Sequence, residues 1–333
     1  MAPRNDFGPP VHMEVTKDLP SPTAQDGKAP PTQIVWRNVV IMSLLHMGAI
    51  FGLFLLPSAH PYTLMWVMKC LCSPAVICYS LSALGVTAGA HRLWAHRSYK
   101  ARLPLRIFLA IINCMSLQND IYDWSRDHRV HHKYSETPAD PHNAKRGFFF
   151  AHIGWLLVRK HPDVITKGKQ IDLTDVLNDP VVKVQRKLYA PAAVLMCFII
   201  PTLVPSLWGE SLVTAFFISV LRYVLALNAT WLVNSAAHMW GNKPYDKFIN
   251  PSQNFPVAVL AMGEGWHNYH HTFPYDYATS ELGWKVNPTT VFIDFMARLG
   301  LAYDRKKVSP NVIRARVSRT GDGTWEKSAQ SID

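Results

Sequence analysis

The stretch Asp127-His128-Arg129-Val130-His131-His132 decides how this chain is interpreted, because it sets three imidazoles at positions i, i+3 and i+4. On a helix, side chains at this spacing fall on one face. The same spacing recurs at His267-Asn268-Tyr269-His270-His271, and a looser pair, His91 and His96, lies upstream. Together with His238, nine of the fifteen histidines gather in four short segments.

Nine imidazoles exceed what one metal ion takes, since a structural zinc binds four ligands and a catalytic zinc three plus water. The histidines therefore indicate two metal ions. Neutral imidazoles suit iron, copper or zinc, whereas magnesium and calcium prefer oxygen ligands. Zinc has no redox chemistry, so oxidation of an unactivated C–H bond leaves iron and copper as the options. A surface histidine triplet without function is the alternative for one such motif, but two copies flanked by membrane-length apolar runs argue against it.

The composition favours a membrane protein. The chain has 333 residues, 49% of them hydrophobic, and a net charge of +11. The apolar residues are bunched into long runs, which fits one membrane-embedded domain better than two soluble domains. The basic excess fits an anionic membrane surface or an acidic partner, and no nucleic-acid-binding motif is present. The cysteines lie in apolar runs without C-x-x-C spacing, which predicts reduced, buried thiols at Cys70, Cys72, Cys78, Cys114 and Cys197.

Four apolar runs approach the length of about 20 residues that a bilayer requires. They pair across short links into two hairpins, 39–57 with 64–89 and 188–205 with 212–233. Residues 104–118 are apolar but short, which predicts an interfacial or buried helix. The predicted fold is therefore an all-α integral membrane protein with four transmembrane helices in two hairpins, under a helical cap that holds a histidine-rich di-metal centre.

Charge sets the predicted orientation. Both hairpin tips lack arginine and lysine, apart from Lys69 just inside the second run, while segments 91–187 and 234–333 are rich in them. The positive-inside rule then places both termini and every histidine cluster in the cytosol. We expect a disordered cytosolic tail at 1–33, a membrane domain at 34–306 and a polar cytosolic tail at 307–333. Arg222, deep in the fourth run, is either paired within the bundle or marks a shifted span.

Local spacing raises two further questions about the site. His91 and His96 are five residues apart, which is about 140° on a regular helix. They can bind one metal only if the helix ends between them; otherwise they serve different metals. No H-E-x-x-H string occurs, so a zincin protease is excluded. Gly263 and Gly265 disfavour a helical turn around the string Glu264–His267. Glu264 and Asp127 are candidates to orient imidazoles.

The strings HRLWAH at 91–96, HRVHH at 128–132, NSAAH at 234–238 and HNYHH at 267–271 resemble those of the membrane acyl-CoA desaturases, specifically the animal stearoyl-CoA Δ9-desaturase family. The resemblance extends over about 35–306 and includes QNDIYDWSRDHRVHHKYSETPADPHN. It implies a di-iron centre in a multi-pass protein of the endoplasmic reticulum membrane. The ligands that it implies are His91, His96, His128, His131, His132, His238, His267, His270 and His271, with Asn234 acting through a water.

The resemblance also implies a reaction and partners. Two hydrogens would be removed from a saturated acyl-CoA, palmitoyl or stearoyl, by O2 and two electrons, leaving a cis double bond and water. The chain lacks the two glycines of a fused cytochrome b5 motif after His161-Pro162, so cytochrome b5 and its NADH-dependent reductase would be separate donors. The acyl-CoA contacts that it implies are Asn38, Asn119, Arg126, Asp127, Arg159, Lys160 and Trp231.

Chain length is the least constrained property. Tyr79 lies one turn from Ala75 on a face of the second run that could line the blind end of the acyl tunnel. We hypothesise that the bulk of Tyr79 shortens the pocket and favours palmitoyl over stearoyl substrates. His142, His152 and His161 fall outside the ligand pattern and are interpreted as ordinary cap histidines.

Two alternatives stay open. The nearer is the same scaffold with different regiochemistry, or a fatty acyl hydroxylase. The more distant is a membrane metal transporter or a non-catalytic metal-binding protein. Transporters place their ligands near the bilayer midplane on broken helices. Here the histidine clusters follow the predicted spans, which disfavours a transporter.

Overall fold

The computed structural model describes residues 32–67 and 77–325. The chain divides into two compact units, Met1–Thr32 and Gln33–Asp333, and the second unit contains every helix and strand that the structure describes. The predicted tail at 1–33 lies almost wholly outside the described residues, as do Cys70, Cys72 and Ala75.

Three helical stretches among the described residues are long and apolar enough to cross a membrane, and they confirm three of the four predicted spans. The remaining predicted span, 64–89, is described only on either side of residues 68–76. The first stretch comprises α1 (Trp36–Leu55) and η1 (Leu56–Ser58). The second comprises α9 (Pro180–Val194), η5 (Leu195–Ile199), α10 (Ile200–Leu203) and η6 (Val204–Trp208). The third comprises α11 (Leu212–Asn234) and α12 (Ala236–Met239).

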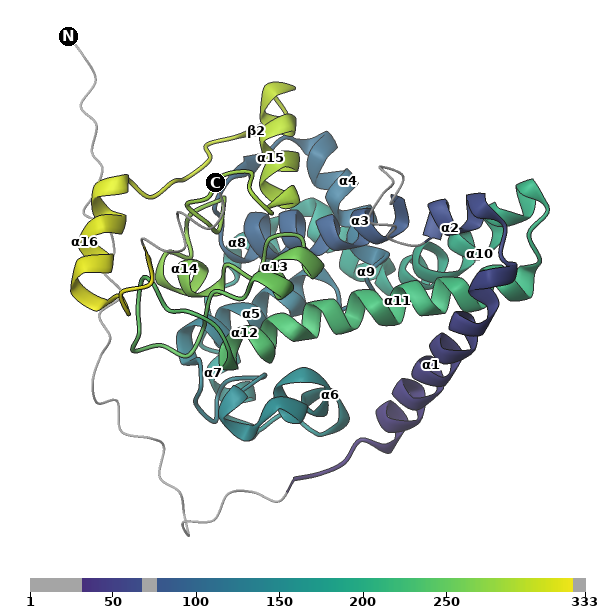
Figure 1. Cartoon of the computed structure of the whole chain (residues 1–333), viewed down its shortest axis with the longest axis horizontal. Helices are drawn as coiled ribbons and strands as arrows, with labels where there is room; N and C mark the ends of the chain where they lie inside the picture. The colour runs from purple at the N-terminus through teal and green to yellow at the C-terminus, as the bar shows by residue number, and fades with distance from the viewer. Residues whose placement is uncertain (1–31, 68–76, 326–333) are drawn as a thin grey trace. The chain divides into compact units, whose positions relative to one another are not determined.

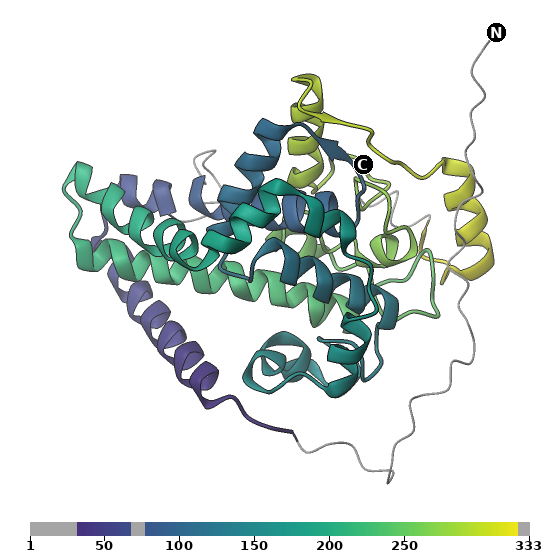
Figure 2. The same cartoon turned by 180° about the vertical axis from the view of Figure 1, so that it is seen from behind.

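The long helix α11 contacts α1, α3, α10 and α12 (Figures 1 and 2). The backbones of α1 and α11 approach closely at Gly52, where a Cβ atom would lie 2.5 Å from the Phe217 carbonyl oxygen. Small residues at helix crossings allow this kind of close packing. The links beyond the spans also touch. The His60 N–H donates to the Glu210 carboxylate (2.8 Å), and the Trp208 indole donates to the Thr63 hydroxyl (2.9 Å).

Arg222 is paired within the bundle, which was the first of the two interpretations of this buried charge. Its guanidinium is fully buried, and Nη2 donates to the Cys197 carbonyl of η5 (2.9 Å). Arg222 therefore supplies a donor to a carbonyl in an apolar environment, where an unsatisfied carbonyl would be costly.

The second predicted run continues from α2 (Pro61–Val67) and α3 (Ile77–Leu84) into η2 (Gly85–Ala95), which is a π-helix. It ends directly before His96, whose N–H donates to the His91 carbonyl (3.0 Å). Hydrogen bonds between residues five apart bring such residues nearly above one another. The helix thus ends between His91 and His96, and its winding makes the two side chains converge.

The helix η2 packs closely on α4 (Leu103–Cys114). A Cβ atom at Gly85 would lie 2.4 Å from the Asn113 backbone nitrogen, and the Asn113 amide donates to the Gly85 carbonyl (3.2 Å). As predicted for a short apolar helix, α4 buries one face and exposes Ile107 and Ile111 on the other.

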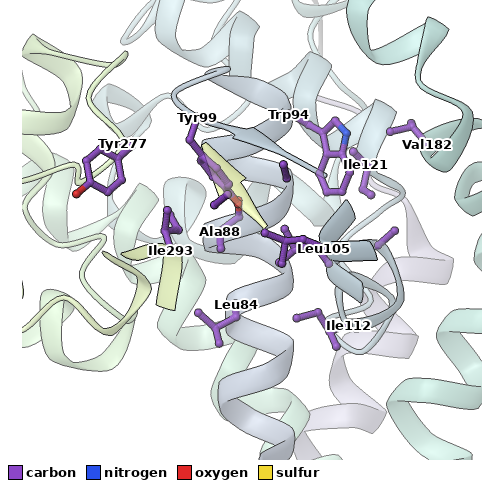
Figure 3. Close-up of a cluster of buried hydrophobic side chains, with 14 of the residues drawn as sticks. Leu84, Ala88, Trp94, Tyr99, Leu105, Ile112, Ile121, Val182, Tyr277 and Ile293 are labelled. Carbon is purple, nitrogen blue, oxygen red and sulfur yellow. The ribbon is translucent and has the colours of Figure 1, made fainter. Parts of the chain in front are cut away.

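The main core lies between η2, α4, the start of α9 and the cap helices (Figure 3). Buried side chains from these elements converge there, among them Ala88, Trp94, Leu105, Ile112, Ile121, Val182 and Ile293. The cap is built from α5 (Ile121–Tyr134), η3 (Ala144–Arg146), η4 (Phe150–Gly154), α6 (Trp155–Leu157), α7 (Pro162–Gly168), α8 (Thr174–Asn178), α13 (Phe255–Leu260), α14 (His267–Thr272) and α15 (Pro288–Arg298). A two-residue antiparallel pairing joins β1 (Lys100–Ala101) to β2 (Ala302–Tyr303).

The segment after residue 306 differs from the predicted polar tail, because it is folded as far as the structure describes it. The helix α16 (Pro310–Thr320) begins at Ser309, whose hydroxyl accepts from the Val312 N–H. Ile313 and Val308 are buried with Tyr245 and other aromatic residues of the cap. The segment has few apolar residues, which favours a polar tail. Those that it has are spaced so that they pack on one buried cluster.

Candidate metal centre

The histidine-rich stretch at 127–132 lies on a helix, as its spacing predicts. The helix α5 begins after Asp120, whose side chain accepts from the Asp123 N–H (3.0 Å), and its last turn carries His131 and His132. A side-chain cap at the N-terminus and basic residues in the last turn both stabilise a helix. The second copy of the spacing lies on α14, which has only six residues.

The structure brings all nine candidate histidines together in two groups. Within each group, one ring nitrogen per residue lies within 4.8 Å of all the others. The helices α5 and α14 each contribute to both groups and lie close together with α12 (Figure 1). The first group comprises His91, His96, His128, His132 and His270. The second group comprises His131, His238, His267 and His271.

Ring nitrogens of neighbouring imidazoles face one another at short range. In the first group, the Nε2–Nε2 distances are 3.0 Å for His91 with His270 and 2.8 Å for His96 with His128. In the second group, the Nε2 atoms of His238 and His267 are 2.9 Å apart. Convergence of this many nitrogens on two points is the arrangement that metal coordination requires.

Three carboxylates lie beside the Nδ1 atoms of histidines in the two groups. The Nδ1 atom lies 3.1 Å from Glu264 in His91, 2.8 Å from Asp140 in His131 and 2.7 Å from Glu136 in His238. A carboxylate that accepts from Nδ1–H leaves Nε2 as the free ligand atom, which is how metal-bound histidines are commonly oriented. In His131, Nε2 is buried and has no hydrogen-bond partner within the described part of the chain. The donor set therefore fits metal ions.

Burial sets the protonation of the site. It lowers the pKa of most of these imidazoles, which keeps them neutral and able to bind a metal; these are His96, His128, His132, His238, His267, His270 and His271. For His131, burial acts in the same direction, but the Asp140 carboxylate outweighs it and raises the pKa. Burial raises the pKa of Glu264, but the adjacent Arg92 guanidinium and the His91 ring outweigh this and lower it to about 2.

Arg92 supports Glu264 from behind. It is fully buried, and its Nη2 donates to Glu264 Oε1 (2.8 Å) while Nη1 donates to the Thr290 hydroxyl (2.9 Å). Removing one partner of a buried ion pair strongly destabilises the folded protein, because the other charge stays buried without compensation. Sequence reasoning predicted that Glu264 could orient an imidazole but did not single out Arg92, Glu136 or Asp140. Arg92 could have been noticed in the sequence, because it is a charged residue inside the histidine motif HRLWAH.

Two cavities adjoin the histidines. The first, here called the Asp127 cavity, is lined among others by Asn119, Asp127 and Trp231. The second, the Tyr79 cavity, runs along α3 and η2 from Tyr79 to His91. Both cavities share the lining residues Gln118, Trp124, His128, Thr230 and Asn234. They therefore meet beside the first histidine group, where the Gln118 amide donates to the Thr230 hydroxyl (3.1 Å).

The residues predicted to contact acyl-CoA differ in their partners and in their exposure. The Asp127 carboxylate forms ion pairs with Arg126 (3.0 Å) and with the Lys160 ammonium. It therefore differs from Glu264, whose carboxylate lies beside an imidazole. Asn38 donates to the Leu156 carbonyl (2.7 Å), and Arg159 is exposed. At the other end, the Tyr79 hydroxyl donates to the Leu260 carbonyl (2.8 Å).

His142, His152 and His161 belong to neither group. The ring of His142 packs edge-on against Trp155, with centroids 4.3 Å apart. His152 contacts the Ser235 hydroxyl and the Asn228 side chain, each at 3.0 Å, and His161 accepts from the Asp163 N–H (3.2 Å). The three described cysteines, Cys78, Cys114 and Cys197, are buried and free, as predicted.

The fold and the site together define a helical protein with membrane-length spans, whose cap gathers two histidine-rich groups that could hold metal ions. Residues 64–283 match the family model described as fatty acid desaturase. The chain is 64% identical over 293 residues to stearoyl-CoA desaturase 5 of Homo sapiens, covering 87% of this chain and 86% of that protein. It is 64% identical over 303 residues to an acyl-CoA desaturase of Cyprinus carpio, covering 90% of each. It is 56% identical over 320 residues to stearoyl-CoA desaturase of Homo sapiens, covering 95% of this chain and 87% of that protein. The chain belongs to the fatty acid desaturase family.

Proposed function

We propose that this chain is an acyl-CoA Δ9-desaturase, which uses O2 and two electrons to introduce a cis double bond into palmitoyl- or stearoyl-CoA. The observation that carries the proposal is the pair of adjoining cavities, because an extended acyl chain could occupy both while passing the first histidine group. The names of the relatives support the substrate class and the reaction.

The nine histidines are the proposed ligands of two iron ions, and Asn234, which lines both cavities, is proposed to hold one of them through a water. When bound, iron would supply the oxygen-dependent oxidation of C–H bonds, which zinc cannot do. Glu264, Asp140 and Glu136 keep the proton on Nδ1 of their histidines and so hold each Nε2 atom toward the metal sites.

The charged side chains beside the Asp127 cavity are proposed to bind the coenzyme A head. Arg126 and Lys160 both contact Asp127, and guanidinium and ammonium groups are suited to phosphate. Asn38, Asn119 and Arg159 are proposed to add polar contacts, and the buried Trp231 to form part of the acyl-chain wall.

The residues where the two cavities meet are proposed to hold one pair of carbons beside the histidines and to keep water away. Trp124 stacks on His128 with ring centroids 4.7 Å apart, and Gln118 is hydrogen-bonded to Thr230 opposite. A fixed, largely apolar passage selects a position on a featureless chain by geometry, since methylenes differ in nothing else. Tyr79 is proposed to limit the chain length at the far end of the Tyr79 cavity; Ala75, predicted to share this role, lies outside the described residues.

The membrane arrangement that we propose has four spans in two hairpins, with both termini and the cap in the cytosol and the protein in the endoplasmic reticulum. The contacts between His60 and Glu210 and between Trp208 and Thr63 support it, because they join the two links beyond the spans. We assign 34–306 to the desaturase domain. Cytochrome b5 and its NADH-dependent reductase are the proposed electron donors, and the charge of +11 would favour an acidic donor.

Expression in a yeast that lacks its own desaturase tests the proposal. Fatty acids are analysed by mass spectrometry with the double-bond positions determined. We expect Δ9 monoenes from the native chain and none from His131→Ala. Double bonds at another position or hydroxy acids would reject the Δ9 assignment, and absence of any product from an iron-loaded protein supplied with cytochrome b5 would reject the enzymatic function.

A further inference from the structure

The second histidine-rich helix, α14, is too short to hold its own position. It has six residues, and Trp266 at its start makes no side-chain capping bond. Isolated helices of this length are unstable in water, so packing must fix where α14 lies. By contrast, α5 has fourteen residues and a side-chain cap at Asp120. Yet α14 carries three of the nine candidate ligands, His267, His270 and His271, and serves both groups.

The residues on the other side of α14 point away from the histidines. At 100° per residue, Asn268, Tyr269 and Thr272 lie opposite His267, His270 and His271. Asn268 and Tyr269 are fully buried. The Tyr269 ring packs against Tyr245 and Phe273, with ring centroids 5.0 Å away in each case. Whatever covers this face sets the position of the three histidines.

Part of that cover comes from residues 308–325, here called the C-terminal segment. Val308 and Ile313 share one buried cluster with Tyr245, Tyr269 and Phe273. Trp325 packs against the same cluster, and its indole donates to Glu281 (2.5 Å).

Two hydrogen-bonded connections run from the C-terminal segment to α14. In the first, the buried carboxylate of Asp276 accepts from the Val308 N–H (2.9 Å) and from the Tyr269 hydroxyl (2.8 Å). In the second, Arg316 forms an ion pair with Asp246. The Asp246 backbone donates to the Asn268 side chain (3.1 Å) and accepts from it (2.9 Å). Both connections end on the two residues that stand between His267 and His270.

We propose that the C-terminal segment 308–325 is a brace that positions α14, and that Arg316, Asp276 and Ile313 are positioning residues for metal binding. The proposal rests on the proposed function only for the identity of the metal. Its measurable consequence is metal retention, so it can fail or succeed independently of whether the reaction is Δ9 desaturation.

The test is the rate at which the purified, iron-loaded full-length chain releases iron to a ferrous chelator. Removing a direct partner of a metal ligand commonly weakens metal binding by about 10-fold or more. Arg316 acts one contact further out, through Asp246 and Asn268, so we expect Arg316→Gln to release iron faster than the native chain by less than this factor. Arg319→Gln is the matched control, because Arg319 is an exposed arginine on the same helix. Arg316→Lys, which keeps the positive charge beside Asp246, should recover most of the retention.

A second readout separates positioning from general stability. Because Arg316→Gln leaves the buried Asp246 carboxylate without its counter-charge, its metal-free melting temperature should fall below that of Arg319→Gln, but by less than its iron-loaded melting temperature falls. Tyr269→Phe, which keeps the ring and removes the hydroxyl that donates to Asp276, should also release iron faster. The brace is refuted if Arg316→Gln and Tyr269→Phe release iron at the native rate. It is equally refuted if the metal-free melting temperature of Arg316→Gln falls as far as that of the iron-loaded variant, since the loss is then structural.

Discussion

Replacing Tyr79 with alanine should move the substrate preference toward longer chains. The side chain is 6% exposed and lines the Tyr79 cavity, and its hydroxyl is anchored on the Leu260 carbonyl. Stearoyl-CoA has two methylenes more than palmitoyl-CoA, and each buried methylene contributes about 0.8 kcal/mol, so room for both is worth about 1.6 kcal/mol. Expressed in kcat/KM, this is a shift of about 15-fold in the stearoyl-to-palmitoyl ratio.

The assay is competition between the two acyl-CoA substrates, with the products separated by mass spectrometry. Tyr79→Phe is the control, because it removes the bond to Leu260 and keeps the volume of the ring; its product ratio should stay near the native value. Removing a large buried side chain costs about 3 to 5 kcal/mol of stability, so activity is compared per folded, iron-loaded molecule. An unchanged ratio in Tyr79→Ala, or an equal shift in Tyr79→Phe, would show that volume at this position does not set chain length.

One further prediction concerns the packing of η2 on α4, and two concern the metal centre. Gly85→Ala should lower stability by about 1 to 3 kcal/mol through overpacking, because the new methyl group would meet the Asn113 backbone; an unchanged melting temperature would contradict the close crossing. Glu264→Gln should cost about 3 to 5 kcal/mol and reduce the iron content, since it leaves the Arg92 guanidinium buried without its counter-charge; a loss below about 1 kcal/mol in thermal unfolding would count against that pair. Removing metal with a chelator should abolish desaturation, and activity should return with ferrous iron but not with zinc, as measured by product formation; restoration by zinc would exclude the proposed redox role.

The sequence predicted the features that depend on residues close to one another in the chain. The apolar runs gave three spans that the structure describes, and the spacing at 128–132 gave the helix α5. The sequence could not predict which histidines of α5 belong to which group, because His131 and His132 are neighbours in sequence and belong to different groups. That division depends on partners more than a hundred residues away, such as His270 and His238.

Long-range contacts explain the other differences. Asp140 and Glu136 lie in a polar loop whose composition is that of any surface turn, and only the fold brings them to His131 and His238. The C-terminal segment was expected to be a tail because its apolar residues are few. Its order depends on aromatic residues of the cap, such as Tyr245, which sequence position alone does not connect to it.

The π-helical winding of η2 makes this part of the chain intolerant of changes in length. His91 and His96 share one group because the backbone places residues five apart on the same side, and side chains of Asn113 and Tyr99 donate to the carbonyls of Gly85 and Ala88 on that helix. One residue more or fewer between the two histidines would turn one imidazole out of the group. Divergence within such a family should therefore proceed here by substitution alone, while insertions and deletions accumulate in the surface loops of the cap.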